Sequence, residues 1–396
     1  MSVSNGRQFL SIPGPTTVPD EVLSAMHRPA VDIYSGTLLD VTETCLGALK
    51  TVFATQGSTY IYAANGHGAW EAALANVLNR GDKVLALESG RFAIGWGEMG
   101  KVLGVEVEVL PGDWRRAVDP AAVEARLKQD TTGEIKAILV VQIDTASGVI
   151  NDIAAVRAAM DAAGHDALLM VDVIASLACV PFEMDAWGVD VAVGGAQKGL
   201  MTPPGLAFNA VGEKAMAAHR KGADLGTFYW DWTARDGTEH YNKYCGTPPE
   251  HMLFGLRKAL DMLLDEGLEN VFRRHALLAE ATRRAVDVWS QGQALGFNIT
   301  EPAERSNSIT CVRMADGHES DPLLAYCQEK CGVTVGVGIG GLGGKAFRIA
   351  HMGHVNAPMM FGTLGVIEQG LAAVGLPHGA GGVQAAIDYL ADAVPA

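Results

Sequence analysis

Apolar runs that alternate with amphipathic segments occupy residues 60 to 215 of this 396-residue chain. Most of these runs are apolar almost continuously, which is typical of strands covered on both faces. They are residues 83–88, 105–110, 136–143, 167–174, 189–194 and 205–211. We therefore expect an α/β fold in which helices flank a mostly parallel sheet and ligands bind at the carboxyl ends of the strands.

The segments between the runs have the apolar spacing of helices. The candidates are residues 69–78, 121–128 and 153–163. Asp119 and Pro120 give the second of them a cap and a first-turn proline. A longer helical pattern covers about residues 250–289, and Gly267 is expected to divide it into two helices.

This organisation predicts one large and one smaller domain. We expect an N-terminal segment at 1–20, a large cofactor-binding domain at 21–265 and a smaller α+β C-terminal domain at 266–396. The long helix would bridge them, and strands near 308–313 and 347–350 would belong to the smaller domain. About 150 residues per domain is a usual size, which fits a chain of this length.

Charge and cysteine content narrow the classes of function. Acidic residues outnumber basic ones by 45 to 30, and a net charge of −15 repels phosphate backbones and anionic lipids. We expect no nucleic-acid and no membrane partner. Six scattered cysteines without a zinc spacing predict reduced thiols and no metal in a cytoplasmic protein. Neither a secretory signal at the start nor a peroxisomal tripeptide at the end is expected.

Asp172 and Lys198 carry the strongest chemical signal. Asp172 follows four apolar residues, where a carboxylate is costly to bury without a cationic partner. Lys198 follows the next apolar run and stands among glycine and alanine, so its amine is expected to have little side-chain cover. An acid at one strand end and a lysine after the next strand suit a pyridoxal phosphate site. From these two residues alone, a helix-capping aspartate and a surface lysine fit equally well.

A phosphate site is predicted at the turn that contains Asn65, Gly66 and His67. This turn follows an apolar run and precedes a helix, whose N-terminus offers free N–H groups and a positive dipole end. An ordinary Asn-Gly turn is the alternative. Residues 336–341 match G-x-G-x-x-G, but no clear helix follows and no acid stands about 20 residues later. We therefore do not expect a dinucleotide site.

Arg348 alternates with apolar neighbours in a predicted strand of the smaller domain. Its guanidinium is suited to bind a substrate carboxylate through two hydrogen bonds. A salt-bridged strand arginine is the alternative. We interpret the nearby His351 and His354 as loop histidines with satisfied hydrogen bonds and not as metal ligands.

Taken together, these features resemble one family, the class V, fold-type I pyridoxal-phosphate aminotransferases of the alanine–glyoxylate type. The serine–glyoxylate and aspartate–glyoxylate branch is the most similar part of that family. The resemblance covers about residues 10–390. It rests on ordered motifs at 13–16, 65–71, 144–149, 184–190, 195–198, 247–249, 254–261 and 344–349.

The resemblance implies a role for each matching residue around the cofactor. Lys198 is similar to the Schiff-base lysine, and Asp172 to the acid that pairs with the pyridinium nitrogen. The residues similar to those that hold the phosphate are Gly66, His67 and Gln197, next to Asn65. Thr145 matches the hydroxyl that bonds to the ring oxygen, and Phe92 falls where an aromatic side chain stacks on the ring.

The same resemblance implies how substrate and partner subunit contribute. Arg348 matches the residue that binds the substrate carboxylate, helped by the backbone of Pro13 and Gly14. Tyr244 and Thr247 match residues that reach the cofactor phosphate of the neighbouring subunit. The resemblance therefore implies a homodimer with shared active sites.

The choice of amino donor is where this chain departs from the family. Tyr34 is followed by serine where the plant serine–glyoxylate enzymes have arginine. A dicarboxylate donor would need another cation, for which the sequence offers Arg91, Arg220 and Lys221. The bulky side chains of Tyr34 and Trp96 are expected to keep long 2-oxo acids out of the pocket.

The resemblance implies ping-pong transamination of glyoxylate to glycine, with serine or aspartate as the donor. An alanine–glyoxylate enzyme, or one that uses another small 2-oxo acid, is the nearest alternative. A pyridoxal-phosphate lyase or desulfurase would need a nucleophilic cysteine, for which Cys245 is the candidate. A binding module without catalysis is the remaining alternative, and the presence of both Lys198 and Asp172 argues against it.

Overall fold

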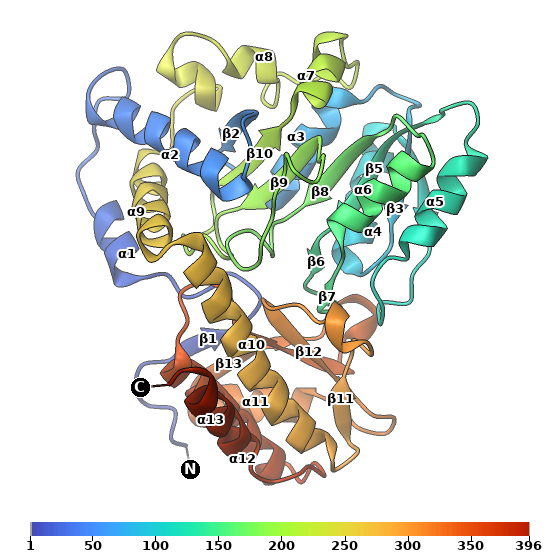
Figure 1. Ribbon diagram of the computed structural model, residues 1–396. Coiled ribbons are helices and arrows are strands. Elements are labelled where there is room, and N and C mark those ends of the chain that lie inside the picture. The colour runs from blue at the N-terminus through green and yellow to red at the C-terminus, as the bar shows by residue number, and fades with distance from the viewer. Residues whose placement is uncertain (1, 396) are drawn as a thin grey trace.

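The computed structural model describes residues 2–395, and a seven-stranded sheet organises its larger part (Figure 1). In sheet order the strands are β2 (Ser58–Tyr62), β10 (Ala207–Val211), β9 (Val191–Gly195), β8 (Leu168–Asp172), β5 (Ile135–Val141), β3 (Lys83–Leu87) and β4 (Glu106–Leu110). β10 is antiparallel to both of its neighbours, and the other pairs are parallel. The predicted α/β fold with a mostly parallel sheet is confirmed.

Helices cover both faces of this sheet, which explains why its strands are apolar without alternation. On one face lie α2 (Thr37–Phe53), α5 (Pro120–Gln129), α6 (Ile153–Ala162) and α9 (Glu250–Glu266). On the other face lie α3 (Gly66–Val77), α4 (Arg91–Leu103) and α7 (Glu213–Arg220). In β8, Leu169 and Val171 join the first hydrophobic cluster, while Leu168 and Met170 join the second.

The smaller part is built on a five-stranded sheet (Figure 1). In sheet order its strands are β1 (Phe9–Ser11), β13 (Val333–Val337), β14 (Ala346–Ala350), β12 (Ile309–Met314) and β11 (Leu295–Phe297). The helices that share its hydrophobic cluster are α10 (Leu268–Ser290), α11 (Asp321–Cys331), α12 (Ala357–Ala373) and α13 (Gly382–Ala393). Because β1 pairs in parallel with β13, the N-terminal segment is part of this sheet. We keep the division at residues 265 and 266 as a proposal.

Short elements connect these bodies. They are α1 (Asp20–Met26), the hairpin β6 (Ile143–Asp144) and β7 (Val149–Ile150), α8 (Trp232–Arg235), and the 3₁₀ helices η1 (His240–Tyr244), η2 (Pro302–Glu304) and η3 (Gly340–Leu342). As predicted, the long helical pattern divides at Gly267, whose φ of +83° ends α9 and allows α10 to begin. In Figure 1, α10 runs from the large sheet to the small one.

Two predicted boundaries are corrected by the structure. The helix expected at 69–78 begins at Gly66, because the side chain of Asn65 accepts hydrogen bonds from His67 and Gly68 and caps it there. The strand expected at 136–143 ends at Val141, and Ile143 instead belongs to the β6–β7 hairpin. Within residues 2–395, no helix is both long and apolar enough to cross a bilayer.

Candidate active site

A cavity of about 260 Å³ lies where strands β5, β8 and β9 end and helix α3 begins. Its wall contains eight of the predicted cofactor residues: Asn65, Gly66, His67, Phe92, Thr145, Asp172, Gln197 and Lys198. Apolar side chains such as Val141, Ile143 and Ile174 complete it. Segments from five different elements and loops thus converge at the sheet edge where the strand pattern places a ligand.

Asp172 is the last residue of β8 and is 3% exposed. One carboxylate oxygen accepts the backbone N–H of Ile174 at 2.7 Å, and the other accepts the indole N–H of Trp70 at 2.7 Å. Burial raises the pKa of Asp172 to about 7, although these two donors act in the opposite direction. No cationic group among residues 2–395 lies within ion-pair distance of it. The acid is therefore oriented and ready for a cation that the described chain does not supply.

Lys198 follows β9 and is 9% exposed. The expectation of an amine with little cover is wrong, because a distant segment covers it. The ammonium donates to the carbonyl of Pro13, and a Cβ on Gly14 would lie only 2.6 Å from the lysine Cδ. Burial, and to a smaller extent the guanidinium of Arg348, lowers the pKa of Lys198 to about 8. This lysine has a substantial neutral fraction near physiological pH, as a nucleophile and proton carrier requires.

The small residues around Lys198 serve backbone packing. A Cβ on Gly199 would lie 2.2 Å from the carbonyl oxygen of Leu177, so only glycine permits this approach. Likewise, a Cβ on Gly66 would lie 2.3 Å from the side chain of Ile174 at the cavity wall. These glycines therefore bring the loop that carries Lys198 and the start of α3 close to the strand end that carries Asp172.

The start of α3 lies at the cavity wall, where the sequence predicts a phosphate site. Asn65 caps the helix, and the positive end of its dipole points to the same side. The ring of His67 lies 4.6 Å from the ring of Trp70, and burial lowers the pKa of this histidine. The side-chain oxygen of Gln197 is buried with no hydrogen-bond partner in the described chain. This oxygen is therefore available to accept a hydrogen bond from a ligand in the cavity.

Arg348 lies on β14, next to this cavity, and is 8% exposed. Its guanidinium donates to the carbonyl of Val337 at 2.6 Å and to the carbonyl of Thr145 at 3.0 Å. No carboxylate among residues 2–395 lies within ion-pair distance, so the salt-bridged alternative is wrong. A buried cation held only by neutral carbonyls retains the capacity to bind a carboxylate.

The glycines of the rejected dinucleotide motif have a place beside Arg348. Gly336 is paired with Arg348 across the sheet, and a Cβ on this glycine would lie 2.7 Å from Pro13 and 2.8 Å from the arginine carbonyl. The motif overlaps the three-residue helix η3, and the next element is strand β14 and not an α-helix. Its glycine therefore allows the Pro13–Gly14 turn and the Arg348 strand to approach each other.

Several other predicted residues do not line this cavity. Tyr34 is 69% exposed, Thr247 is exposed, and Tyr244 is buried with its hydroxyl 2.8 Å from that of Thr42. Trp96 is fully buried against Trp70, so the expectation that it narrows the pocket is wrong. Helix α4 turns this side chain toward the sheet and away from the cavity.

The other residues singled out in the sequence are accounted for elsewhere. Arg91 pairs with Glu98 and Arg220 with Glu213, and Lys221 is exposed at the end of α7. His351 is buried, with Nδ1 2.8 Å from the Asn307 carbonyl and Nε2 3.0 Å from the Thr310 hydroxyl, as expected for a satisfied histidine. His354 is exposed. The described residues contain no cluster of three or more His, Cys, Asp or Glu suited to a metal ion.

Two residues of the site were missed in the sequence. Trp70 contacts Asp172, as described above, and Asp144 accepts the backbone N–H groups of Phe92 at 2.8 Å and Ala93 at 3.1 Å. Asp144 thereby caps α4 and fixes the position of Phe92 at the cavity wall. Both residues stand inside motifs that the sequence displays, at 65–71 and 144–149, and this placement was the available signal.

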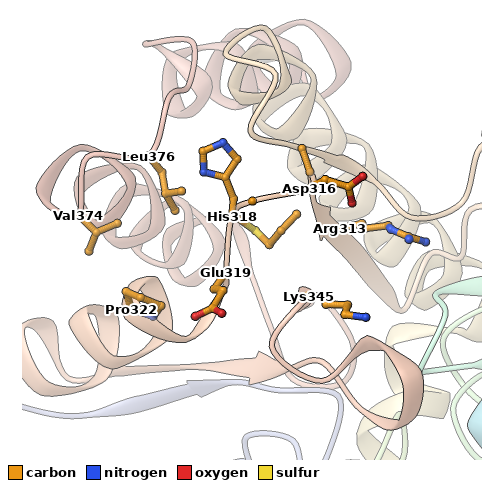
Figure 2. A pocket seen from close by; sticks show the side chains of 11 residues that line it. Arg313, Asp316, His318, Glu319, Pro322, Lys345, Val374 and Leu376 are labelled. Atoms are coloured by element: carbon orange, nitrogen blue, oxygen red, sulfur yellow. The ribbon is translucent and has the colours of Figure 1, made fainter.

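A larger cavity, of about 490 Å³, lies at the end of the small sheet where β12 ends and β14 begins (Figure 2). Its lining side chains carry both signs of charge, including Arg313, Asp316, Glu319 and Lys345, around His318. Glu319 and Lys345 are exposed, and none of the predicted site residues is present. We place the chemistry in the smaller cavity because buried groups with shifted pKa values gather there.

The fold and the smaller cavity define a pyridoxal-phosphate enzyme of fold-type I. The residues fit this cofactor: Asp172 lacks a cation, Gln197 has an unpartnered oxygen, and the amine of Lys198 is buried beside them. The family model for class-V aminotransferases matches residues 9–345. The chain belongs to the class-V aminotransferases, and its cofactor is pyridoxal 5′-phosphate.

Individual relatives are similar over nearly the whole chain. A serine–glyoxylate aminotransferase of Methylorubrum extorquens is 39% identical over 97% of this chain and 96% of its own length. An L-aspartate–glyoxylate aminotransferase of Paracoccus denitrificans is 37% identical over 96% of this chain and 95% of its own. The crystal structure of ureidoglycine–glyoxylate aminotransferase from Bacillus subtilis superposes with a TM-score of 0.88 at 25% identity, covering 98% of this chain and 99% of that one.

Proposed function

We propose that the enzyme transfers the amino group of L-serine or L-aspartate to glyoxylate, which leaves as glycine, in two half-reactions at one site. The observation that carries this proposal is the convergence of buried Lys198 and Asp172 on one cavity, with unpaired Arg348 beside it. The names of the relatives support glyoxylate as the acceptor and serine or aspartate as donors.

Steady-state assays with glyoxylate and each of serine, aspartate and alanine test the proposal. We expect turnover with serine or aspartate to exceed turnover with alanine, and glycine to appear in equal amount to the keto acid. Preference for alanine, or for pyruvate over glyoxylate as acceptor, would replace the proposed substrates with those of the nearest alternative.

The cavity favours serine of the two donors. Its lining holds Lys198 and His67 but no arginine, and Arg348 beside it is assigned to the carboxylate common to all substrates. A second carboxylate on the donor would need a further cation, because a buried charge without a partner is costly. In the described chain Arg91 and Arg220 are already paired and Lys221 does not line the cavity, so we expect this cation to come from a partner subunit.

Each part of the cavity has a role in holding the cofactor. When bound, pyridoxal phosphate supplies a ring that withdraws electrons from the α-carbon of the substrate. Asp172 would hold the ring nitrogen, and the start of α3 with Gln197 would hold the phosphate. Thr145 would donate to the ring oxygen while Phe92 covers a ring face.

Lys198 would carry the proton in the reaction. Its lowered pKa keeps part of the amine neutral, so it can take the proton from the α-carbon and return it to the cofactor side. Pro13 and Gly14 cover the lysine and keep water away from it. Arg348 would hold the substrate carboxylate so that the α-hydrogen faces the amine.

Replacement of Arg348 tests the carboxylate site. In Arg348→Ala we expect kcat/KM to fall for donor and glyoxylate alike, because both carboxylates use this guanidinium in turn. The fall should correspond to a loss of about 2–5 kcal/mol of transition-state stabilisation. Cofactor affinity should remain close to that of the wild type. Arg313→Ala, which removes another arginine of the same sheet (Figure 2), is the matched control and should not affect either substrate. A defect limited to the donor would show that Arg348 recognises the donor side chain.

We propose further that the enzyme is a homodimer with shared sites. Thr247 is exposed and lies outside its own chain's cavity, which leaves it free to reach a partner's. Exposed aromatic side chains lie near this segment: Tyr241 accepts the backbone N–H of Gly246 with its carbonyl and packs against Tyr34, and Phe228 accepts the thiol of Cys245 with its carbonyl. Apolar patches of this kind are typical of subunit interfaces. Tyr244 is buried against Thr42 and would support the segment that carries Thr247.

Mixing two inactive variants tests the shared site. Lys198→Ala is combined with the double variant Tyr244→Phe/Thr247→Ala by refolding the two chains together. In a shared-site heterodimer both defects fall in one site and the other site is intact, so random pairing should restore up to about a quarter of wild-type activity. If Tyr244 and Thr247 instead contributed to the site of their own chain's Lys198, each site of a heterodimer would carry one defect. No activity would then return, even when native mass spectrometry detects mixed dimers.

The remaining alternatives are less well supported by the site. Cys245 lies outside its own chain's cavity, and its half-buried thiol donates to the carbonyl of Phe228 at 3.7 Å, so as the nucleophile of a desulfurase it would have to leave this contact and enter a partner's cavity. We also propose a cytoplasmic location, because all six cysteines are free and cysteines usually stay reduced in that compartment. Cell fractionation that finds the enzyme in an oxidising compartment would contradict this location.

A further inference from the structure

We propose that Trp70 is a positioning residue that keeps Asp172 ionised and aimed at the cofactor ring, an inference that rests on the proposed role of Asp172. The indole N–H donates to one oxygen of this carboxylate at 2.7 Å, and Trp70 is 1% exposed. Among residues 2–395, Trp70 is the one side chain that donates a hydrogen bond to Asp172.

The surroundings of Asp172 make this donor important. Burial and the nearby carboxylate of Asp144 favour its neutral form, while the N–H groups of Ile174 and Trp70 and the charge of Lys198 favour the carboxylate. With the cofactor bound, one proton is shared between Asp172 and the ring nitrogen. Each donor to the carboxylate therefore moves that proton toward the nitrogen, where it makes the ring a better electron acceptor.

Trp70 is held rigidly enough to act as a positioning residue. Its ring stacks on Trp96 with centroids 5.9 Å apart and planes 15° apart, and it also packs against His67 and the edge of Phe92. Because Trp70 lies near the start of α3, the helix that would hold the phosphate also orients the acid at the other end of the ring. A fixed donor of this kind needs no reorganisation during the reaction.

The experiment uses holoenzyme loaded with cofactor that is ¹⁵N-labelled at the ring nitrogen. In Trp70→Phe we expect the nitrogen chemical shift to move from the pyridinium toward the neutral pyridine value. A hydrogen bond to a charged group predicts a change of about ten- to a hundredfold in the ratio of the two forms. We expect kcat to fall more than KM rises, because Arg348 still binds the substrate carboxylate.

Trp96→Phe is the matched control. Trp96 is equally buried and stacks in the same cluster, but its indole N–H has no hydrogen-bond partner in the described chain. The same change of indole to phenyl there should leave the ¹⁵N shift at the wild-type value. An equal shift in both variants would mean that packing, and not the hydrogen bond, is responsible, and would overturn the inference.

Two further variants complete the test, and the first of them keeps it decisive if Trp70→Phe does not fold. Benzothienylalanine at position 70 keeps the shape of the side chain but replaces N–H by sulfur, and it should reproduce the shift. In the Asp172→Asn background, Trp70→Phe should have no additional effect on the nitrogen, as expected for coupled residues. An unchanged shift in the position-70 variants overturns the role of Trp70, whereas an unchanged shift in Asp172→Asn itself overturns the proposed role of Asp172.

Discussion

Lys198→Ala should retain the fold and lose transamination by several orders of magnitude. The substitution removes both the amine that binds the cofactor covalently and the group that moves the proton. Its effect on stability should be modest, because burying a lysine with a lowered pKa is itself costly and the main partner lost is one backbone carbonyl, that of Pro13. Single-turnover kinetics and circular dichroism of the same preparation measure the two effects.

Borohydride reduction of the wild-type holoenzyme gives a direct readout of the same assignment. Reduction should fix the yellow cofactor permanently on one lysine, and peptide mapping should identify Lys198. Lys345→Ala is the control, since Lys345 is exposed and lies in the other cavity (Figure 2). If the reduced cofactor is found on a different lysine, the assignment of Lys198 is wrong.

Asp172→Asn should lower the rate much more than it lowers stability. An asparagine keeps the size of the side chain, but it carries no charge with which to hold a proton on the ring nitrogen. Loss of the hydrogen bond to a charged group costs about 1.5–3 kcal/mol. This corresponds to a tens- to hundredfold loss in rate, and the weakened electron withdrawal adds to it.

The expected effect of Asp172→Asn on stability has a physical basis as well. Burial raises the pKa of Asp172, so the carboxylate is already unfavourable in the folded apoenzyme, and a neutral amide relieves that cost. The amide oxygen can accept only one of the two N–H groups that the carboxylate accepts, so we expect the two effects to offset each other and the denaturation midpoint of the apo variant to stay close to that of the wild type. Turnover close to that of the wild type in Asp172→Asn would remove this residue from the mechanism.

The local pattern of the sequence was sufficient to predict the residues at strand ends. Asp172 and Lys198 each follow a mostly apolar run, and each lies at the end of its strand or just beyond it. The turn at Asn65 was predicted for the same reason, since a capping side chain and glycines mark the start of a helix without reference to the rest of the fold. Such signals depend on neighbours in the sequence, and they are visible there.

Contacts between distant segments could not be predicted in this way. Lys198 is covered by Pro13 and Gly14, and Asp172 is bonded to Trp70, although each pair lies more than 100 residues apart in the chain. The pattern of α4 did not reveal that Trp96 faces the sheet, because a tryptophan suits a core and a pocket equally well. Roles that depend on tertiary packing needed the structure.

Strand β1 has a consequence for the order in which the enzyme is made. It precedes the strands of the large sheet along the chain, yet it pairs with β13, which follows them, and the turn after β1 covers Lys198. The large sheet can form while synthesis continues, whereas this pairing waits until β13 has been made. Before that pairing, the turn at Pro13 and Gly14 has no sheet to hold it against Lys198, so we expect the cavity to close over the cofactor only after β13 has been made.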